Sequence, residues 1–181
     1  MPTPQTLKAQ IKEAFAATKY PGDDLLRGSN EGVEPFRVER DFRGKRDWKS
    51  LSPQFIDGAP DGLASALCFF SHEAFQFYLP AYLVADLDDQ LERIDPVYYL
   101  THGLERSSAS ERINPRRFAG RTWRDYARER FAGFTREQAA AIAAYLIFKR
   151  DADDVLDSTR QEIDDALQDY WKAKAGNSKG S

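Results

Sequence analysis

The chain has 181 residues, of which 41% are hydrophobic and 30% charged, an ordinary balance for a globular protein that can bury a core. A formal net charge of −3 excludes a general attraction to nucleic acid or to an anionic membrane. The single cysteine, Cys68, excludes a disulfide within the chain, and Lys8 and Lys12 interrupt any stretch resembling a signal peptide. We therefore expect a reduced, cytoplasmic domain over 1–175, no membrane span and a disordered tail over 176–181.

Capping residues and apolar spacing predict short helices in the first third of the chain. Thr3 before Pro4 has the cap-then-proline pattern of a helix start. The expected helices are residues 4–18, an amphipathic helix through Phe42 that stops at Gly44, and an Ala-rich helix opening at Pro60-Asp61. Residues 48–56 are expected to be irregular, with apolar anchors, and Cys68 is expected to be a packed core thiol.

The segment over about 72–91 is expected to be the central helix. Ser71 is placed to cap it, and apolar residues recur on two faces, so that between Ala74 and Ala85 only Gln76 is strongly polar. A helix that is apolar nearly all round has to be buried. Pro80 removes one helical hydrogen bond, so the helix either bends at Leu79-Pro80 or ends near Tyr78 before a second one starts; we favour the bend.

Similar signals continue to the C-terminus. Asp95-Pro96 starts a helix that Gly103 ends, residues 105–121 read as an exposed loop, and a short helix follows around Trp123. Thr135 with Gln138 forms a capping box for a long helix, with a break expected over 149–157. Asp157 or Ser158 is expected to cap the last helix. No strand-like alternation persists anywhere, so the fold class is all-α: a single-domain bundle of six to eight helices around the central helix.

The central segment also carries a resemblance. Phe70-Ser71-His72-Glu73-Ala74-Phe75 with Leu79-Pro80-Ala81 resembles the motif of a family of small bacterial proteins of unknown function, which reads about Leu-Ser-Pro-Glu-Ala-Phe, two variable residues, then Leu-Pro-Ala. Weaker similarity extends to 42–45, to 134–138 and to Tyr170-Trp171. The resemblance implies a helical fold and a bacterial origin, and it implies no activity. His72 replaces the usual proline, which argues against a shared catalytic role for it.

The residues that could hold a metal do not form a complete motif. A zinc site of the metalloprotease type would need histidine at position 76, where the chain has glutamine, and His102 lies 30 residues from His72. The acidic run from Asp86 to Asp95 lacks the glycine and glutamate of a calcium loop and is expected to be a solvated helix end. We expect no metal and no cofactor.

The stretch 105–136 holds nine arginines against four acids, with aromatic residues between them. Arginine with aromatics suits contact with phosphate and with nucleic-acid bases, yet residues 150–172 hold eight acids against three bases. The expectation we favour is that the basic stretch faces the acidic last helix or forms a solvated surface. Its candidate partner-binding residues are Arg112, Arg116, Arg117, Arg121, Trp123, Arg124 and Arg128.

Three hypotheses of function follow. The first is a protein-binding module of the immunity or adaptor type without catalytic residues, suggested by separate basic and acidic blocks and surplus aromatics. The second is an enzyme whose dispersed acids and arginines assemble only in the fold. The third is RNA or DNA binding through 105–136. The sequence favours the first hypothesis and leaves the oligomeric state open.

Overall fold

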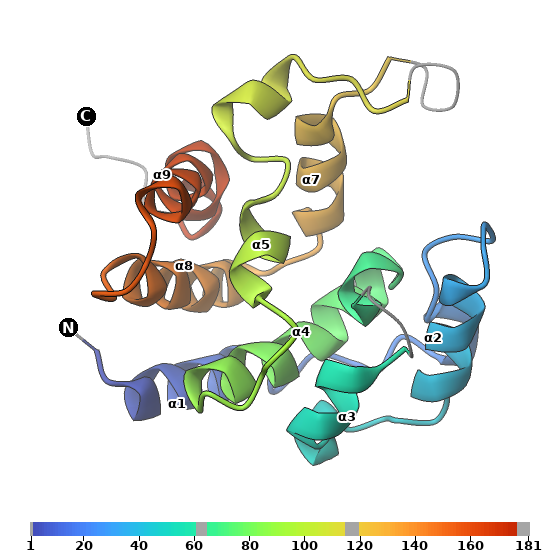
Figure 1. Cartoon of the computed structure of the whole chain (residues 1–181). Helices are drawn as coiled ribbons and strands as arrows, with labels where there is room; N and C mark the ends of the chain where they lie inside the picture. The colour runs from blue at the N-terminus through green and yellow to red at the C-terminus, as the bar shows by residue number, and fades with distance from the viewer. Residues whose placement is uncertain (1, 61–64, 115–119, 177–181) are drawn as a thin grey trace. The chain divides into compact units, whose positions relative to one another are not determined.

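The computed structural model describes residues 2–60, 65–114 and 120–176 and is all-α over that part of the chain (Figure 1). Counting the continuous segment 157–174 as one, these residues form eight α-helices and no strand, which confirms the expected fold class. None of the described helices is long and apolar enough to cross a membrane. The expected tail beyond Gly176 and the start of the helix expected at Asp61 lie outside the described residues.

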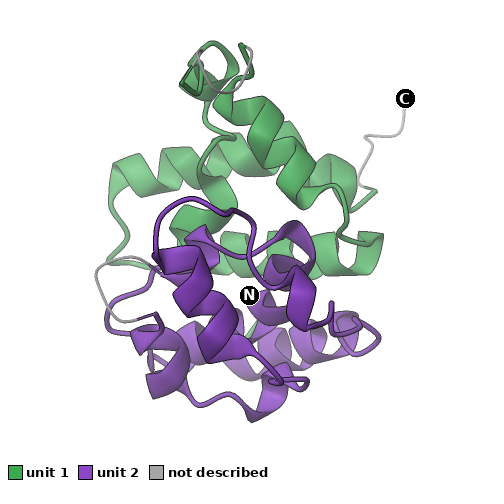
Figure 2. Ribbon diagram, turned by 90° about the vertical axis from the view of Figure 1, so that its right-hand side faces the viewer, with its two compact units in different colours: residues 1–3, 97–181 green, residues 4–96 purple. Residues whose placement is uncertain are grey.

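The chain divides into two compact units (Figure 2). Unit 2 comprises residues 4–96, and unit 1 comprises residues 97–181 together with 1–3. The described residues of unit 2 form four helices and three short 3-10 turns: α1 (Pro4–Ala14), η1 (Asp23–Leu25), α2 (Glu34–Phe42), η2 (Trp48–Ser50), α3 (Pro53–Gly58), η3 (Ala66–Cys68) and α4 (His72–Leu87).

Helix α4 is the most buried helix of unit 2 and packs against α1, α3 and η2. The Ser71 hydroxyl accepts a hydrogen bond from the amide of Ala74 at 3.0 Å, so the expected cap is confirmed. The helix runs through Pro80 without interruption, so the alternative of two separate helices is wrong, and a bend at Pro80 stays a prediction. It ends at Leu87, four residues before the expected end at 91, and Asp89 follows with φ 52°.

A loop far away in sequence holds the start of α4. The amide of Ser71 donates to the carbonyl of Leu26 at 3.1 Å, and the amide of Gly28 donates to that of Phe69 at 2.7 Å. A Cβ on Gly28 would lie 2.6 Å from the carbonyl oxygen of Phe70, so only glycine allows this approach. The loop thus fixes where α4 begins.

Two expectations about residues 48–68 are wrong. Residues Pro53–Gly58 form α3 rather than an irregular stretch, because Ser52 caps them by accepting a hydrogen bond from the amide of Phe55. Cys68 is exposed rather than packed. It is the third residue of η3, and successive residues of a 3-10 helix point to different sides, so Ala66 and Leu67 are buried while Cys68 faces out.

Over its described residues, unit 1 contains most of α5 (Pro96–Thr101), the 3-10 turn η4 (Arg106–Ala109), α7 (Trp123–Phe131), α8 (Arg136–Arg150), α9 (Asp157–Ala166), the π-helical segment η5 (Leu167–Trp171) and α10 (Lys172–Lys174). The break expected over 149–157 is confirmed, and so is the capping box of Thr135 and Gln138. The expected cap of the last helix is wrong, because Leu156 occupies the cap position and makes no side-chain bond there.

Trp171 forms the centre of the core of unit 1. Its side chain is fully buried, and its Nε1 donates to the carbonyl of Leu100 at 2.9 Å. Its ring lies 4.8 Å from that of Phe131 and 5.8 Å from that of Phe134, measured between centroids. The last helical segment is therefore part of the core rather than an appendage.

Candidate functional site

The basic stretch pairs with the acidic last helical segment. Arg106 Nε lies 3.2 Å from a carboxylate oxygen of Asp165, and Arg124 Nη2 lies 2.6 Å from one of Asp169. Arg124 also donates to the carbonyl of Glu105 at 3.1 Å. Two of the arginines that suggested nucleic-acid binding are thus compensated within unit 1.

The other candidate arginines are placed differently. Arg121 forms an ion pair with Glu129 of α7. Arg112 is exposed and forms an isolated antiparallel bridge with Thr122, and Arg128 is exposed on α7. Arg116 and Arg117 lie outside the described residues. The expected exposed loop over 105–121 is only partly confirmed, because Ser108 and Ile113 are buried.

Four rings from α5, the residue that follows it and α7 form a continuous row, here called the aromatic ladder: Tyr98, His102, Trp123 and Tyr126. Tyr98 stacks on His102 with centroids 5.0 Å apart, and His102 lies 4.9 Å from Trp123. Trp123 meets Tyr126 edge to face at 6.2 Å. Tyr98 is 50% exposed, and the other three rings are partly exposed. The ladder therefore presents aromatic surface to solvent.

Gly103 is what allows the ladder to form. Its φ of 86° ends α5 in the left-handed region that glycine adopts without strain. A Cβ at this position would lie 2.8 Å from the carbonyl oxygen of Trp123 and 2.9 Å from the Cβ of Ala127. The end of α5 thus lies directly against α7, which brings His102 beside Trp123.

Glu105 supplies a carboxylate beside the ladder, with Oε1 3.7 Å from Nδ1 of His102. Its Oε2 accepts hydrogen bonds from the Ser108 hydroxyl at 2.7 Å and from the Gly103 amide at 2.8 Å. Burial raises the pKa of Glu105, but the bonds from His102, Ser108 and the neighbouring backbone amides outweigh burial and lower the pKa to about 2. Glu105 is therefore ionised at neutral pH.

Sequence reasoning identified Trp123 and Arg124 and missed the part of the ladder contributed by Tyr98 and His102. The sequence does contain a signal for these two residues, because they stand four positions apart near an expected helix and so share one face. Their contact with Trp123 cannot be predicted from the sequence, since it depends on the turn at Gly103.

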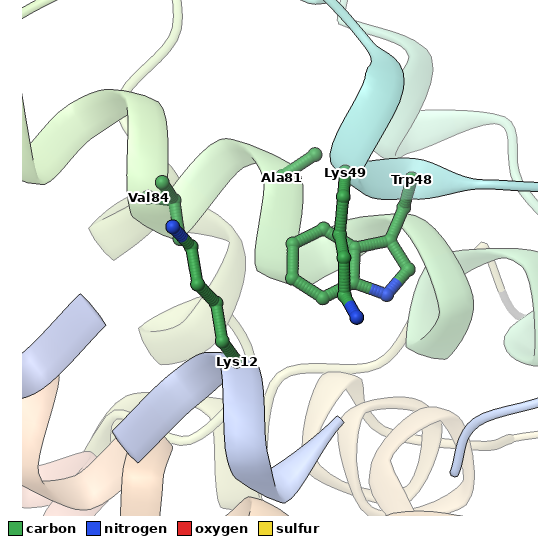
Figure 3. A pocket seen from close by; sticks show the side chains of 5 residues that line it. All are labelled: Lys12, Trp48, Lys49, Ala81 and Val84. Atoms are coloured by element: carbon green, nitrogen blue, oxygen red, sulfur yellow. The ribbon is translucent and has the colours of Figure 1, made fainter. Parts of the chain in front are cut away.

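Unit 2 contains a separate pocket of about 230 Å³ between α1, η2 and α4 (Figure 3). It is lined by Lys12, Trp48, Lys49, Ala81 and Val84. None of these residues is among the candidate binding residues that the sequence indicates. The signal was weak, because Lys12 and Lys49 are ordinary surface lysines in sequence and only the fold brings them to one pocket beside Trp48.

The described part of the chain contains no group of three or more His, Cys, Asp or Glu side chains that could hold a metal ion. His72 is half-buried in the first turn of α4, and His102 belongs to the ladder. Within the acidic run, Asp88 forms an ion pair with Lys8 of α1.

Comparison with known protein families assigns this all-α chain to a class of proteins. The chain matches the family described as "Family of unknown function (DUF6714)" over residues 3–175. The chain belongs to that family. The comparison with curated proteins and the comparison with solved structures each gave no match.

Proposed function

We propose that this protein is a non-catalytic binding module, of the immunity or adaptor type, that docks an acidic surface of one partner protein on the aromatic ladder. The observation that carries the proposal is the exposed row of rings from Tyr98 to Tyr126. Tyrosine, tryptophan and arginine are the residues that contribute most to protein interfaces, because they bury a large rigid area and keep a polar group for specificity.

The charge near the ladder indicates the sign of the charge expected on the partner surface. Arg112 is bridged to Thr122, directly before Trp123, and its side chain is exposed. Arg128 is also exposed, but it follows Trp123 by five residues on α7 and therefore lies about 140° around the helix from it. An acidic partner surface is therefore the favoured complement.

Nucleic-acid binding receives less support from the same geometry. Phosphate contact needs several uncompensated cations along one track, whereas Arg106, Arg121 and Arg124 are each paired with a carboxylate. A row of rings could still stack on bases, so the experiment below includes this alternative.

An acid–base enzyme also receives little support. Glu105 has a pKa of about 2 and therefore has no proton to donate near neutral pH. The pocket in unit 2 is lined by two lysines and no described carboxylate. The expectations of a bacterial origin and a cytoplasmic location accompany the binding proposal and rest on the central motif and the single cysteine.

The test is recovery of a partner from the native host with the full-length tagged protein, after nuclease treatment. We expect one protein at equal stoichiometry, retained by the wild type and lost at least tenfold by Tyr98→Ala and by Arg112→Glu. Phe36→Ala is the matched control, because the ring of Phe36 is 45% exposed, an exposure similar to that of Tyr98, but belongs to α2 in unit 2.

The outcomes separate the hypotheses. Equal loss in Phe36→Ala and Tyr98→Ala, or no stoichiometric protein at all, contradicts the proposal. Retention of RNA that nuclease removes, with a steep dependence on salt, would replace it with the nucleic-acid hypothesis.

A further inference from the structure

The pocket of unit 2 combines an apolar floor with two cations. Trp48 is 5% exposed and Ala81 7%, so the floor consists of the indole and of α4. Lys49 lies along the indole, with Nζ 5.6 Å from the ring centroid. Figure 3 shows Lys12 extending from α1 toward Val84 of α4.

The two lysines differ from Lys8, which lies on the same helix as Lys12. Lys8, one turn before Lys12 on α1, forms an ion pair with Asp88 at the end of α4. Lys12 and Lys49 have no carboxylate within ion-pair distance in the part of the chain that the structure describes. The pocket is therefore an apolar site with an unmatched positive charge of two at its walls.

We propose that this pocket binds a small organic anion, a flat aromatic ring that carries one carboxylate. The ring would lie on the floor formed by Trp48, Ala81 and Val84, and the carboxylate would lie between the ammonium groups of Lys12 and Lys49. Apolar contact with the floor needs the ring, and the charge-assisted hydrogen bonds need the carboxylate.

The size of the pocket restricts the ligand. Pockets for drug-sized molecules occupy about 300–1,000 Å³, and this one occupies about 230 Å³. A single ring with a short acidic substituent is therefore a better match than a nucleotide or a peptide. Both lysines are exposed, so affinity depends on the ring and the two charges together.

The experiment titrates the full-length protein against 4-fluorobenzoate and follows the fluorine resonance by NMR. We expect saturable broadening, with affinity reduced about fivefold by Lys12→Ala or by Lys49→Ala and at least tenfold in the double variant. Lys8→Ala is the control, because it removes the same charge from the same helix outside the pocket. Circular dichroism checks that each variant is folded.

Two further probes make the result decisive. The neutral isostere 4-fluorobenzamide should bind at least tenfold more weakly than the acid, and inorganic phosphate should not displace the acid at equal concentration. Equal binding of the amide, an unchanged affinity in the double lysine variant, or full displacement by phosphate would overturn the proposal. Partner recovery through Tyr98 is unaffected by these outcomes, because it depends on a surface in unit 1.

Discussion

Glu105 connects three segments of unit 1 through one side chain and its own backbone. Its carboxylate accepts from Ser108 of η4 and from the amide of Gly103, and its carbonyl accepts from Arg124 of α7. Its pKa is about 2, compared with the usual 4.5. The ionised form is therefore the form that the folded state favours.

Glu105→Gln should make the protein less sensitive to acid. A lowered pKa gives stability that is fully present above pH 4.5 and is lost as the pH falls from 4.5 toward 2. Between pH 7 and pH 3 we expect the wild type to lose about 1 kcal/mol more unfolding free energy than the variant, after allowance for solvent screening. Urea unfolding at the two pH values measures this difference.

Glu111→Gln, a change at an exposed neighbour, is the control and should behave like the wild type. A Glu105→Gln variant that loses as much unfolding free energy between the two pH values as the wild type would disprove this account.

Cys68 should react with a thiol reagent in the folded protein, because its side chain is exposed at the end of η3. We expect one equivalent of a chromogenic disulfide to react in native buffer, at a rate within about tenfold of that in denaturant. A thiol that reacts only after denaturant is added would show that the position is covered. The apolar neighbours of Cys68 suggested burial from sequence, and only the geometry of the turn reveals which of the three residues faces outward.

The positions where helices begin are the feature of the fold that the sequence predicts best, because a cap is a local interaction between residues two or three positions apart. Ser71 and the Thr135–Gln138 box are both used as the sequence indicates. Ser52 before Pro53 has the same pattern as Thr3-Pro4, although its polar neighbours make the pattern harder to recognise. Leu156 shows the limit of the rule, since the last helix starts without any capping side chain.

Ser71→Ala should destabilise the protein more than Ser52→Ala. The Ser71 hydroxyl accepts from the amide of Ala74 and also donates to the carbonyl of Leu25, whereas the Ser52 hydroxyl makes only the capping bond among the hydrogen bonds described. We expect a loss of about 2 kcal/mol for Ser71→Ala and about 1 kcal/mol for Ser52→Ala. Paired denaturant unfolding curves measure both. Equal losses would mean that the contact with the loop at Leu25 contributes nothing.

The candidate site was less predictable than the helices. The sequence supplied its composition, since Trp123 and its arginines lie in the stretch with a basic excess. It did not show which arginines form ion pairs within the chain, because the pairs with Asp165 and Asp169 join residues far apart in the sequence. Long-range contacts of this kind depend on packing and leave no periodic trace in the sequence.

The whole chain should behave as one cooperative domain over 1–175, although it forms two compact units. The boundary between the units falls at Pro96 and Val97, inside α5, whereas independent domains are usually separated by exposed linkers. The family match also covers residues 3–175, which includes both units.

We therefore expect a single thermal transition in calorimetry, with equal calorimetric and van't Hoff enthalpies. Fluorescence of Trp48 in unit 2 and of Trp171 in unit 1, each isolated by replacing the other tryptophans with phenylalanine, should give the same midpoint after correction for the substitutions. Two separated transitions would establish two independent domains.

The bond from Trp171 to Leu100 sets an order of events during synthesis. The acceptor leaves the ribosome 71 residues before its donor, a delay of about 4 to 14 s at ordinary elongation rates. Residues 4–96, by contrast, form a contiguous unit that is complete before translation of α5 has finished. The nascent chain therefore has to hold α5, α7 and α8 without their central tryptophan, and a stop codon placed before position 171 would release a protein whose second half lacks the largest side chain of its core.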